Sequence, residues 1–155
     1  LLMGAVANRA PFLYAGIEAD VPFVDALNSI LDPSLPLTVT EWDEWGDPLH
    51  DKNVYGYMRA YTPYENVASA RERSELFGTP HFPRIFITTS MNDTRVLYVE
   101  PLKWLSRLQE AEVGADAFAR IETEAGHGGV SGRYKAWEQV SLENAWCLDA
   151  MGIRE

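Results

Sequence analysis

An aspartate and a histidine follow two of the strands that the sequence predicts. Asp93 comes after the apolar, β-branched run 84–90, and His127 comes after the run 118–124. The carboxyl ends of parallel strands meet at one crevice, so we expect the two side chains in neighbouring loops. An aspartate that orients a histidine base is two-thirds of a nucleophilic triad, whose third member would be a serine. The alternative is that Asp93 caps a turn and His127 is an ordinary loop histidine between glycines.

The serine of such a triad is not recognisable here. In α/β-hydrolases the order along the chain is serine, acid, histidine, and the serine lies on a Gly-x-Ser-x-Gly elbow. None of the serines of this sequence lies in that pattern. The chain also opens at Leu1 inside an apolar helical pattern, with no N-cap residue ahead of it. We therefore expect residues 1–155 to be the C-terminal part of a longer protein and to be inactive alone.

Strands and helices alternate in the elements that must position this pair. Apolar and β-branched runs predict buried strands over 12–21 and 84–90, and an alternating pattern predicts a third strand over 118–124. Each is followed by loop and helix patterns, which is typical of parallel strands joined by crossover connections. The fold class expected is α/β, with a parallel sheet and helices on both its faces.

The segments between the strands are of two kinds. Prolines, a glycine and acids over 32–48 predict a long ordered loop, and charged residues over 71–78 predict a surface segment. The helices are predicted at the opening residues, over 54–60, from Pro101 through Trp104 and Leu105 to Leu108, and from a cap at Ser131 along a stripe of Tyr134, Trp137, Ser141, Ala145 and Leu148.

The charge of the chain excludes one class of function. The 13 Lys and Arg against 23 Asp and Glu give a formal net charge of -10, without the basic stripe that nucleic-acid binding needs. No apolar run approaches the roughly 18 residues of a membrane span. The single cysteine, Cys147, is expected to be a small buried residue of the last helix. We expect a cytoplasmic protein with neither nucleic acid nor membrane as partner.

Five sequence blocks spread along nearly the whole chain are specific enough to indicate a family. They are DVPFVD at 20–25, LTVTEWDEWGDP at 37–48, YTPYENV at 61–67, NDTRV at 92–96 and GHGGVSGR at 126–133. In composition and in order these blocks resemble the oligopeptidase B (protease II) branch of the prolyl oligopeptidase family.

The resemblance implies the C-terminal portion of an α/β-hydrolase peptidase domain, whose nucleophile elbow and N-terminal β-propeller lie upstream. It implies Asp93 and His127 as triad members and short peptides as substrates, cut after Lys or Arg. Because a basic side chain needs a carboxylate and an apolar wall, the resemblance assigns Glu41 to the pocket, with Phe23 as its wall. The remaining implied roles are Asp43 as a weaker second acid of the pocket and Arg95 as a donor to the substrate backbone.

Several alternatives stay open. Glu41 and Asp43 are otherwise acids of a solvated loop, and Arg95 is otherwise a member of a surface ion pair. The same triad would also serve an esterase or a dipeptidyl peptidase. An alternative outside the enzymes is a noncatalytic fragment or interaction module that retains two triad positions. No cofactor is expected. A metal site that would use Asp47, His50 and Asp51 is a further alternative.

One interaction partner beyond substrate is expected. In the complete protein, the strand before the nucleophile would pair with the strand 12–21. If that upstream strand is missing, the apolar edge of 12–21 is exposed. We expect the isolated chain to self-associate through this edge.

Overall fold

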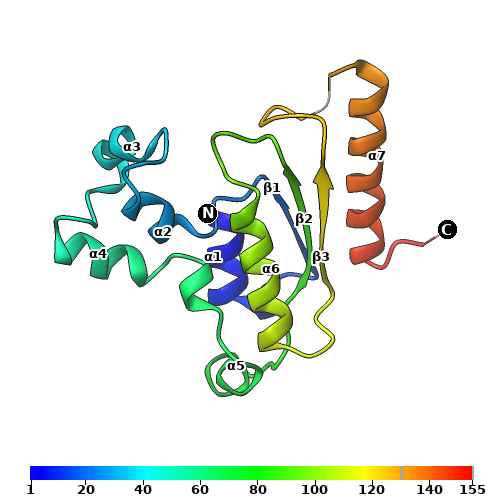
Figure 1. Ribbon diagram of the computed structural model, residues 1–155. Helices are drawn as coiled ribbons and strands as arrows, with labels where there is room; N and C mark the ends of the chain where they lie inside the picture. The colour runs from blue at the N-terminus through cyan, green and yellow to red at the C-terminus, as the bar shows by residue number, and fades with distance from the viewer. Residues whose placement is uncertain (130, 155) are drawn as a thin grey trace.

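Three parallel strands form the centre of the fold (Figure 1). The computed structural model describes residues 1–129 and 131–154. The sheet has the order β1-β2-β3 and pairs in parallel register throughout. Its strands are β1 (Gly16–Asp20), β2 (Arg84–Ser90) and β3 (Ala117–Glu122). The α/β class expected from the sequence is therefore confirmed.

Helices cover both faces of this sheet (Figure 1). On one face α1 (Leu2–Arg9) and α6 (Val99–Ala111) pack against the strands, and on the other lies α7 (Arg133–Ala150). The short helix η1 (Pro11–Leu13) precedes β1. The remaining helices lie between β1 and β2; they are α2 (Ala26–Leu31), α3 (Thr38–Trp45), α4 (Lys52–Arg59), η2 (Tyr64–Asn66) and α5 (Ala70–Phe77).

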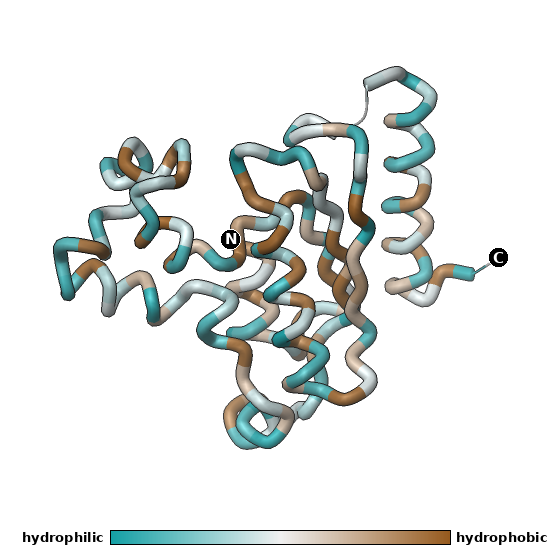
Figure 2. Tube along the Cα trace, in the orientation of Figure 1, coloured by the Kyte–Doolittle hydropathy of each residue, from teal (hydrophilic) through white to brown (hydrophobic). Residues whose placement is uncertain are grey.

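The core sits on the two faces of β2. Ile85 and Ile87 point to one face, where they pack with Trp104 and Leu108 of α6. Phe86 points to the other face, where its ring stacks on Phe118 and contacts Trp146 of α7. Figure 2 shows the resulting band of hydrophobic residues through the sheet. Because both faces are covered, this strand is a continuous apolar and β-branched run without alternation.

The first predicted strand begins later than the sequence pattern suggests. Residues 11–13 form the short helix η1, which Pro11 begins, and the strand starts only at Gly16. A Cβ at Gly16 would lie 2.9 Å from atoms of both Trp146 and Ala150, so close packing of α7 needs a glycine there. The apolar residues 12–14 fit a strand pattern, but their side chains are exposed and lie outside the sheet.

β1 lies at the edge of the sheet. Within residues 1–129 and 131–154 it pairs only with β2. Self-association through this edge stays a prediction.

The predicted loop over 32–48 contains a helix. After Pro33 and Pro36, the segment Thr38–Trp45 has neither proline nor glycine and forms α3. Its indole Trp42 Nε1 donates to the Ile30 carbonyl at 3.0 Å, which ties α3 to α2. The helix ends at Gly46, whose φ of 86° favours glycine.

The segment 71–78 is not a mere surface excursion. It forms α5, with a capping box between Ser69 and Glu72 at its start and Gly78 in the left-handed conformation at its end. Arg73 in its middle is fully buried. Local sequence did not reveal this, because the charged neighbours of Arg73 are themselves exposed.

The ends of two later helices also differ from the prediction. α6 begins at Val99, two residues before Pro101, because a proline is tolerated anywhere in the first turn. The N-cap of α7 is Gly132, and Ser131 makes no side-chain cap bond. The predicted stripe of α7 does not face the sheet throughout.

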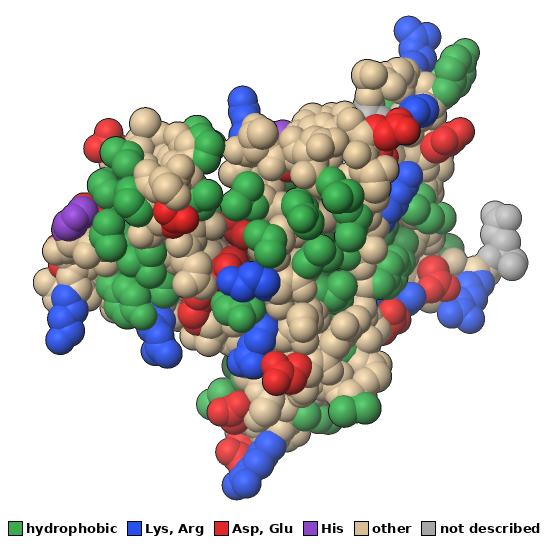
Figure 3. Space-filling view, viewed as in Figure 1, with side chains coloured by type: hydrophobic (Ala, Val, Ile, Leu, Met, Phe, Trp, Pro, Cys, Tyr) green, Lys and Arg blue, Asp and Glu red, His purple; other side chains and the backbone are tan. Residues whose placement is uncertain are grey.

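The aromatic side chains of α7 differ in burial along the helix. Tyr134 and Trp137 are 75% and 57% exposed, whereas Trp146 is buried and contacts Phe86 of β2. Further exposed apolar side chains occur beside α3 and α4 (Figure 3). None of the described helices is both long enough and apolar enough to cross a lipid bilayer.

Candidate functional site

Asp93 and His127 are in direct contact beyond the ends of β2 and β3. His127 Nδ1 lies 2.7 Å from Asp93 Oδ2. The side chain of Asp93 is fully buried, whereas that of His127 is 39% exposed. The two strand ends therefore bring together the pair that the sequence predicts, with the histidine on the solvent side.

The aspartate is prepared to stay ionised. Burial alone would raise the pKa of Asp93, but the N–H groups of Val96 and Arg95 and the His127 ring outweigh it, so the pKa lies below its usual value. The backbone bonds to Asp93 Oδ1 are 2.8 Å from Arg95 N and 3.0 Å from Val96 N. Because an ionised carboxylate only accepts hydrogen bonds, Nδ1 of His127 must carry the ring proton. Nε2 is then the atom that can accept a proton from a nucleophile.

Hydrogen bonds hold the two loops side by side. The Ser90 hydroxyl donates to the Ala125 carbonyl, and Asn92 Nδ2 donates to the Thr123 carbonyl at 3.0 Å. The glycines around His127 allow a tight turn, in which Gly129 N donates to the Gly126 carbonyl at 3.1 Å. Gly129 has a φ of 73°, which a residue with a side chain rarely adopts.

A pocket of about 270 Å³ opens beside His127. Its walls come from α2, α3, the loop that joins them, the loop after Asp93 and the first turn of α6. Four of the residues to which the resemblance assigns a role line this pocket. They are Phe23, Glu41, Arg95 and His127.

Glu41 and Phe23 belong to one aromatic wall. Trp45 Nε1 donates to Glu41 Oε2 at 2.7 Å, and the Trp45 ring lies 5.8 Å from that of Phe23. This bond leaves the second oxygen of Glu41 available to a ligand. An apolar wall beside a carboxylate suits a long side chain with a cationic end.

The other two predicted binding residues differ in position. Asp43 is exposed on α3 and is absent from the set of described residues that line the pocket. Arg95 is exposed at the pocket, and within the described part of the chain it forms no ion pair. Its guanidinium is therefore accessible to a substrate.

Glu100 is a pocket residue that the sequence did not reveal. It lies in the first turn of α6, is 2% exposed and lines the pocket. An acid in a first helical turn is so common that it indicates nothing beyond the helix dipole. Only the packing of α2 onto α6 makes this one a buried wall of the pocket.

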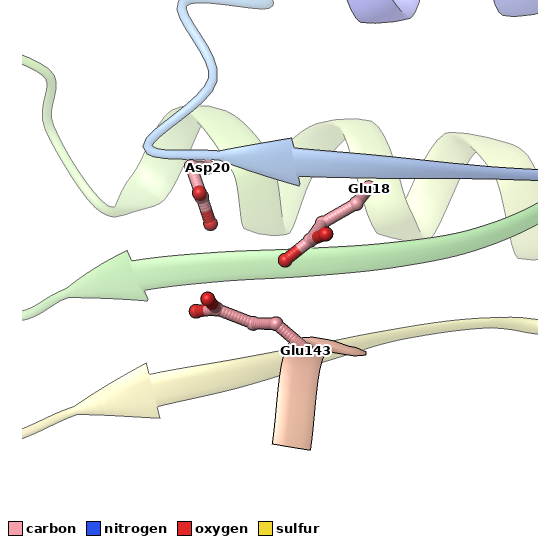
Figure 4. A group of neighbouring side chains, drawn as sticks. All are labelled: Glu18, Asp20 and Glu143. Carbon is pink, nitrogen blue, oxygen red and sulfur yellow. The ribbon is translucent and has the colours of Figure 1, made fainter. Parts of the chain in front are cut away.

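Two other acidic clusters occur among the described residues. Asp47 accepts from the His50 ring at 2.7 Å and Asp51 caps α4, so these residues serve local turns. Of the described residues, the one group with metal-ligand spacing is Glu18 and Asp20 of β1 with Glu143 of α7. Figure 4 shows their carboxylates directed toward one another on one face of the sheet.

The thiol of Cys147 lies next to this group. It contacts Glu18 Oε2 at 3.4 Å, and burial is the largest cause that raises the pKa of the thiol, followed by the contact with Glu18. Cys147 is half-buried on α7. A raised pKa makes it a poor nucleophile, in keeping with the packing role expected.

The family follows from a comparison with known proteins. Residues 1–154 match the model of the prolyl oligopeptidase family. The chain belongs to that family. It is 41% identical over 154 residues to protease 2 of Moraxella lacunata, and 40% identical over 154 residues to dipeptidyl aminopeptidase BI of Pseudoxanthomonas mexicana.

These prolyl oligopeptidase family relatives are much longer than the chain. Each alignment covers 99% of this chain but 21% of protease 2 and 20% of the aminopeptidase. A solved structure of oligopeptidase B from Leishmania major superposes with a TM-score of 0.88 at 36% identity, covering 98% of this chain and 20% of that one. The chain thus spans about a fifth of the length of the relatives it matches.

Proposed function

We propose that this chain is the acid-and-base part of a serine peptidase that hydrolyses short peptides after Lys or Arg. In this mechanism His127 Nε2 removes the proton of a serine hydroxyl and later protonates the leaving amine. Asp93 holds the ring and stabilises the positive charge that forms on it. The serine would come from a part of the protein outside residues 1–155.

One observation carries the proposal. His127 lies 2.7 Å from Asp93, and it also lines a pocket together with Glu41 and Phe23. The base and a carboxylate suited to a cationic side chain are thus neighbours. Arg95, exposed at the same pocket, would donate to the substrate backbone. Asp43 would act only at longer range, because it lies outside the pocket lining.

A dipeptidyl peptidase is the second candidate. It is favoured by the 40% identity to dipeptidyl aminopeptidase BI, which almost equals the identity to protease 2. The two activities differ in what they require of the substrate. An enzyme that releases dipeptides needs a free amino terminus, whereas an endopeptidase accepts a blocked one.

The test uses the complete protein that carries this sequence. Two fluorogenic Arg-Arg amides are used, one with a blocked and one with a free amino terminus. The blocked amide is compared with a blocked version in which citrulline replaces the Arg before the cleaved bond. Citrulline keeps the shape of Arg and removes its charge. We expect cleavage of both Arg substrates, weak cleavage of the citrulline one, and loss of activity in His127→Ala.

Glu41→Gln and Asp43→Asn form a matched pair for the pocket. Losing a hydrogen bond to a charged group costs about 1.5–3 kcal/mol, so Glu41→Gln should lower kcat/KM for the Arg substrate about ten- to hundredfold. Asp43→Asn should change it less than about threefold, because exposed ion pairs contribute little. Cleavage of the free substrate alone would identify a dipeptidyl peptidase, and equal cleavage of Arg and citrulline would contradict basic selectivity.

A further inference from the structure

The carboxylate of Glu100 is held rigidly inside the pocket wall. Its Oε1 accepts from the Ser29 hydroxyl at 2.6 Å, and its Oε2 accepts from the Asp25 backbone N–H at 3.1 Å. Both donors lie on the segment that follows Phe23, so the same segment forms the apolar wall and anchors the acid. Neither donor is charged, and the negative charge of Glu100 is not neutralised by them.

The nearby cation is engaged elsewhere. Lys103, one turn further along α6, donates to Asp25 Oδ2 and lies with its Nζ 4.5 Å from the centre of the Tyr64 ring. No Lys, Arg or amino terminus among the described residues lies within 4.0 Å of the Glu100 carboxylate. Glu100 is thus a buried acid without a cation of its own.

The charged groups that face Glu100 come from every element around it. From the α2 side comes Asp25, and from its own helix comes Lys103. Glu41, Arg95 and the His127 ring line the same pocket. Burial is the main cause that raises the pKa of Glu100 to about 7; the bonds from Ser29 and Asp25 N and the charge of Lys103 oppose the rise, and the charge of Asp25 adds to it.

We propose that Glu100 is a second carboxylate for the cationic side chain of the substrate, which the pocket binds between Glu41 on α3 and Glu100 on α6. A guanidinium has five N–H donors on more than one edge, so it can bond to acids on two walls. Glu41 has one oxygen left after its bond to Trp45, and each Glu100 oxygen keeps a further acceptor site. The inference rests on the proposed function and adds a specificity-determining residue to it.

A dependence on pH follows from the position of Glu100. Below about pH 7 the group is largely protonated and offers no charge, and above it the carboxylate is ionised. A cation in the pocket favours the ionised form, so binding releases a proton near neutrality. KM for a substrate with Arg before the cleaved bond should fall as pH rises through 7, whereas KM for its citrulline counterpart should not.

Glu100→Gln tests the assignment in the complete protein. The glutamine oxygen can accept from Asp25 N–H and its amide can donate to the Ser29 hydroxyl, so both anchoring bonds persist. We expect KM for the Arg substrate to rise about ten- to hundredfold above pH 7, with kcat nearly unchanged. KM of the variant should stay at the low-pH value of the wild type at every pH, and the citrulline substrate should be unaffected.

Ser29→Ala is the matched control, since it removes one anchor and keeps the charge. It should preserve the fall of KM with pH. An equal loss for Arg and citrulline substrates in Glu100→Gln would mean a structural role and would overturn the assignment. So would an Arg preference that the variant retains in full.

The failure of the proposed function would look different. It would appear in the wild type, as cleavage of neither substrate or of both equally. If neither is cleaved, calorimetric binding of acetyl-Arg-amide and acetyl-citrulline-amide decides the matter. A preference for Arg that Glu100→Gln abolishes supports the second carboxylate, whereas equal affinities in the wild type refute it.

Discussion

An acid lies at each end of helix α6, and the two acids have different partners. At its start, Glu100 is bonded by a backbone N–H and a hydroxyl, and its pKa is raised to about 7, mainly by burial. Just past its end, Glu112 accepts from the fully buried Arg73 at 3.0 Å, from Phe82 N at 2.8 Å and from the His81 ring at 2.8 Å.

The two acids differ in whether a cation pairs with them. The Arg73 guanidinium also donates to the carbonyls of Ala68 and Pro80, and it lies 3.6 Å from the centre of the Phe82 ring. All of its partners are internal, so this end of α6 is complete without a ligand. The start of α6 has an acid in excess and faces a pocket. A buried charge that is fully paired belongs to the architecture, whereas one left without a counterion is suited to a charged ligand.

The largest effect on activity is expected at Asp93, in the loop that leads into the pocket end of α6. In Asp93→Asn the amide would donate to His127 and favour the wrong ring tautomer, while Oδ1 still accepts from Arg95 N and Val96 N. We expect kcat of the complete protein to fall about 10⁴-fold with little change in unfolding. Steady-state kinetics and urea denaturation measure the two effects, and a variant as active as the wild type would remove Asp93 from the mechanism.

The opposite result is expected at the other end of the helix. Arg73→Met keeps an apolar stem over Phe82 but removes the cation that pairs with Glu112 and the donor that the carbonyls of Ala68 and Pro80 share. The free energy of unfolding should fall by about 3–5 kcal/mol, as when one partner of a buried pair is removed. Activity per folded molecule should be retained.

A second variant separates the lost pairing from general damage at this site. Adding Glu112→Gln to Arg73→Met should recover part of the stability, because the uncompensated charge is gone. A double variant no more stable than the single one would show that the Glu112 charge does not cause the loss.

The smallest expected effect is a dependence of folding stability on pH, caused by Glu100. The pKa of Glu100 is raised from 4.5 to about 7, so between these values the folded state binds more protons than the unfolded one. Stability therefore falls as pH rises through this window and stays lower above it. The shift corresponds to about 3 kcal/mol, which Glu100→Gln should restore above pH 7 while matching the wild type near pH 4.

Urea denaturation of wild type and variant across this range measures the difference. Glu112→Gln serves as the contrasting change, because Glu112 has a cation partner and its loss should lower stability instead. A constant difference between wild type and Glu100→Gln at all pH values would mean that the Glu100 proton is not linked to folding.

The sequence by itself determined the α/β class, two of the three strands closely and the neighbourhood of Asp93 and His127. These follow from local physics, because a continuous β-branched run marks a buried parallel strand and its carboxyl end fixes where the next residues lie. The glycines around His127 likewise announce a tight turn without any knowledge of the rest of the fold.

Only the tertiary structure decided which charged residues are buried. Glu100 and Arg73 look like ordinary polar positions of helices, since nothing within a few residues of them differs from a solvated helix. Their burial arises from segments far away in sequence: Asp25 and Ser29 close over Glu100, and Glu112 reaches Arg73. The same holds for the first strand, whose start at Gly16 is set by the packing of α7. Local patterns report the backbone's preferences, whereas desolvation of a charge depends on what the whole chain places beside it.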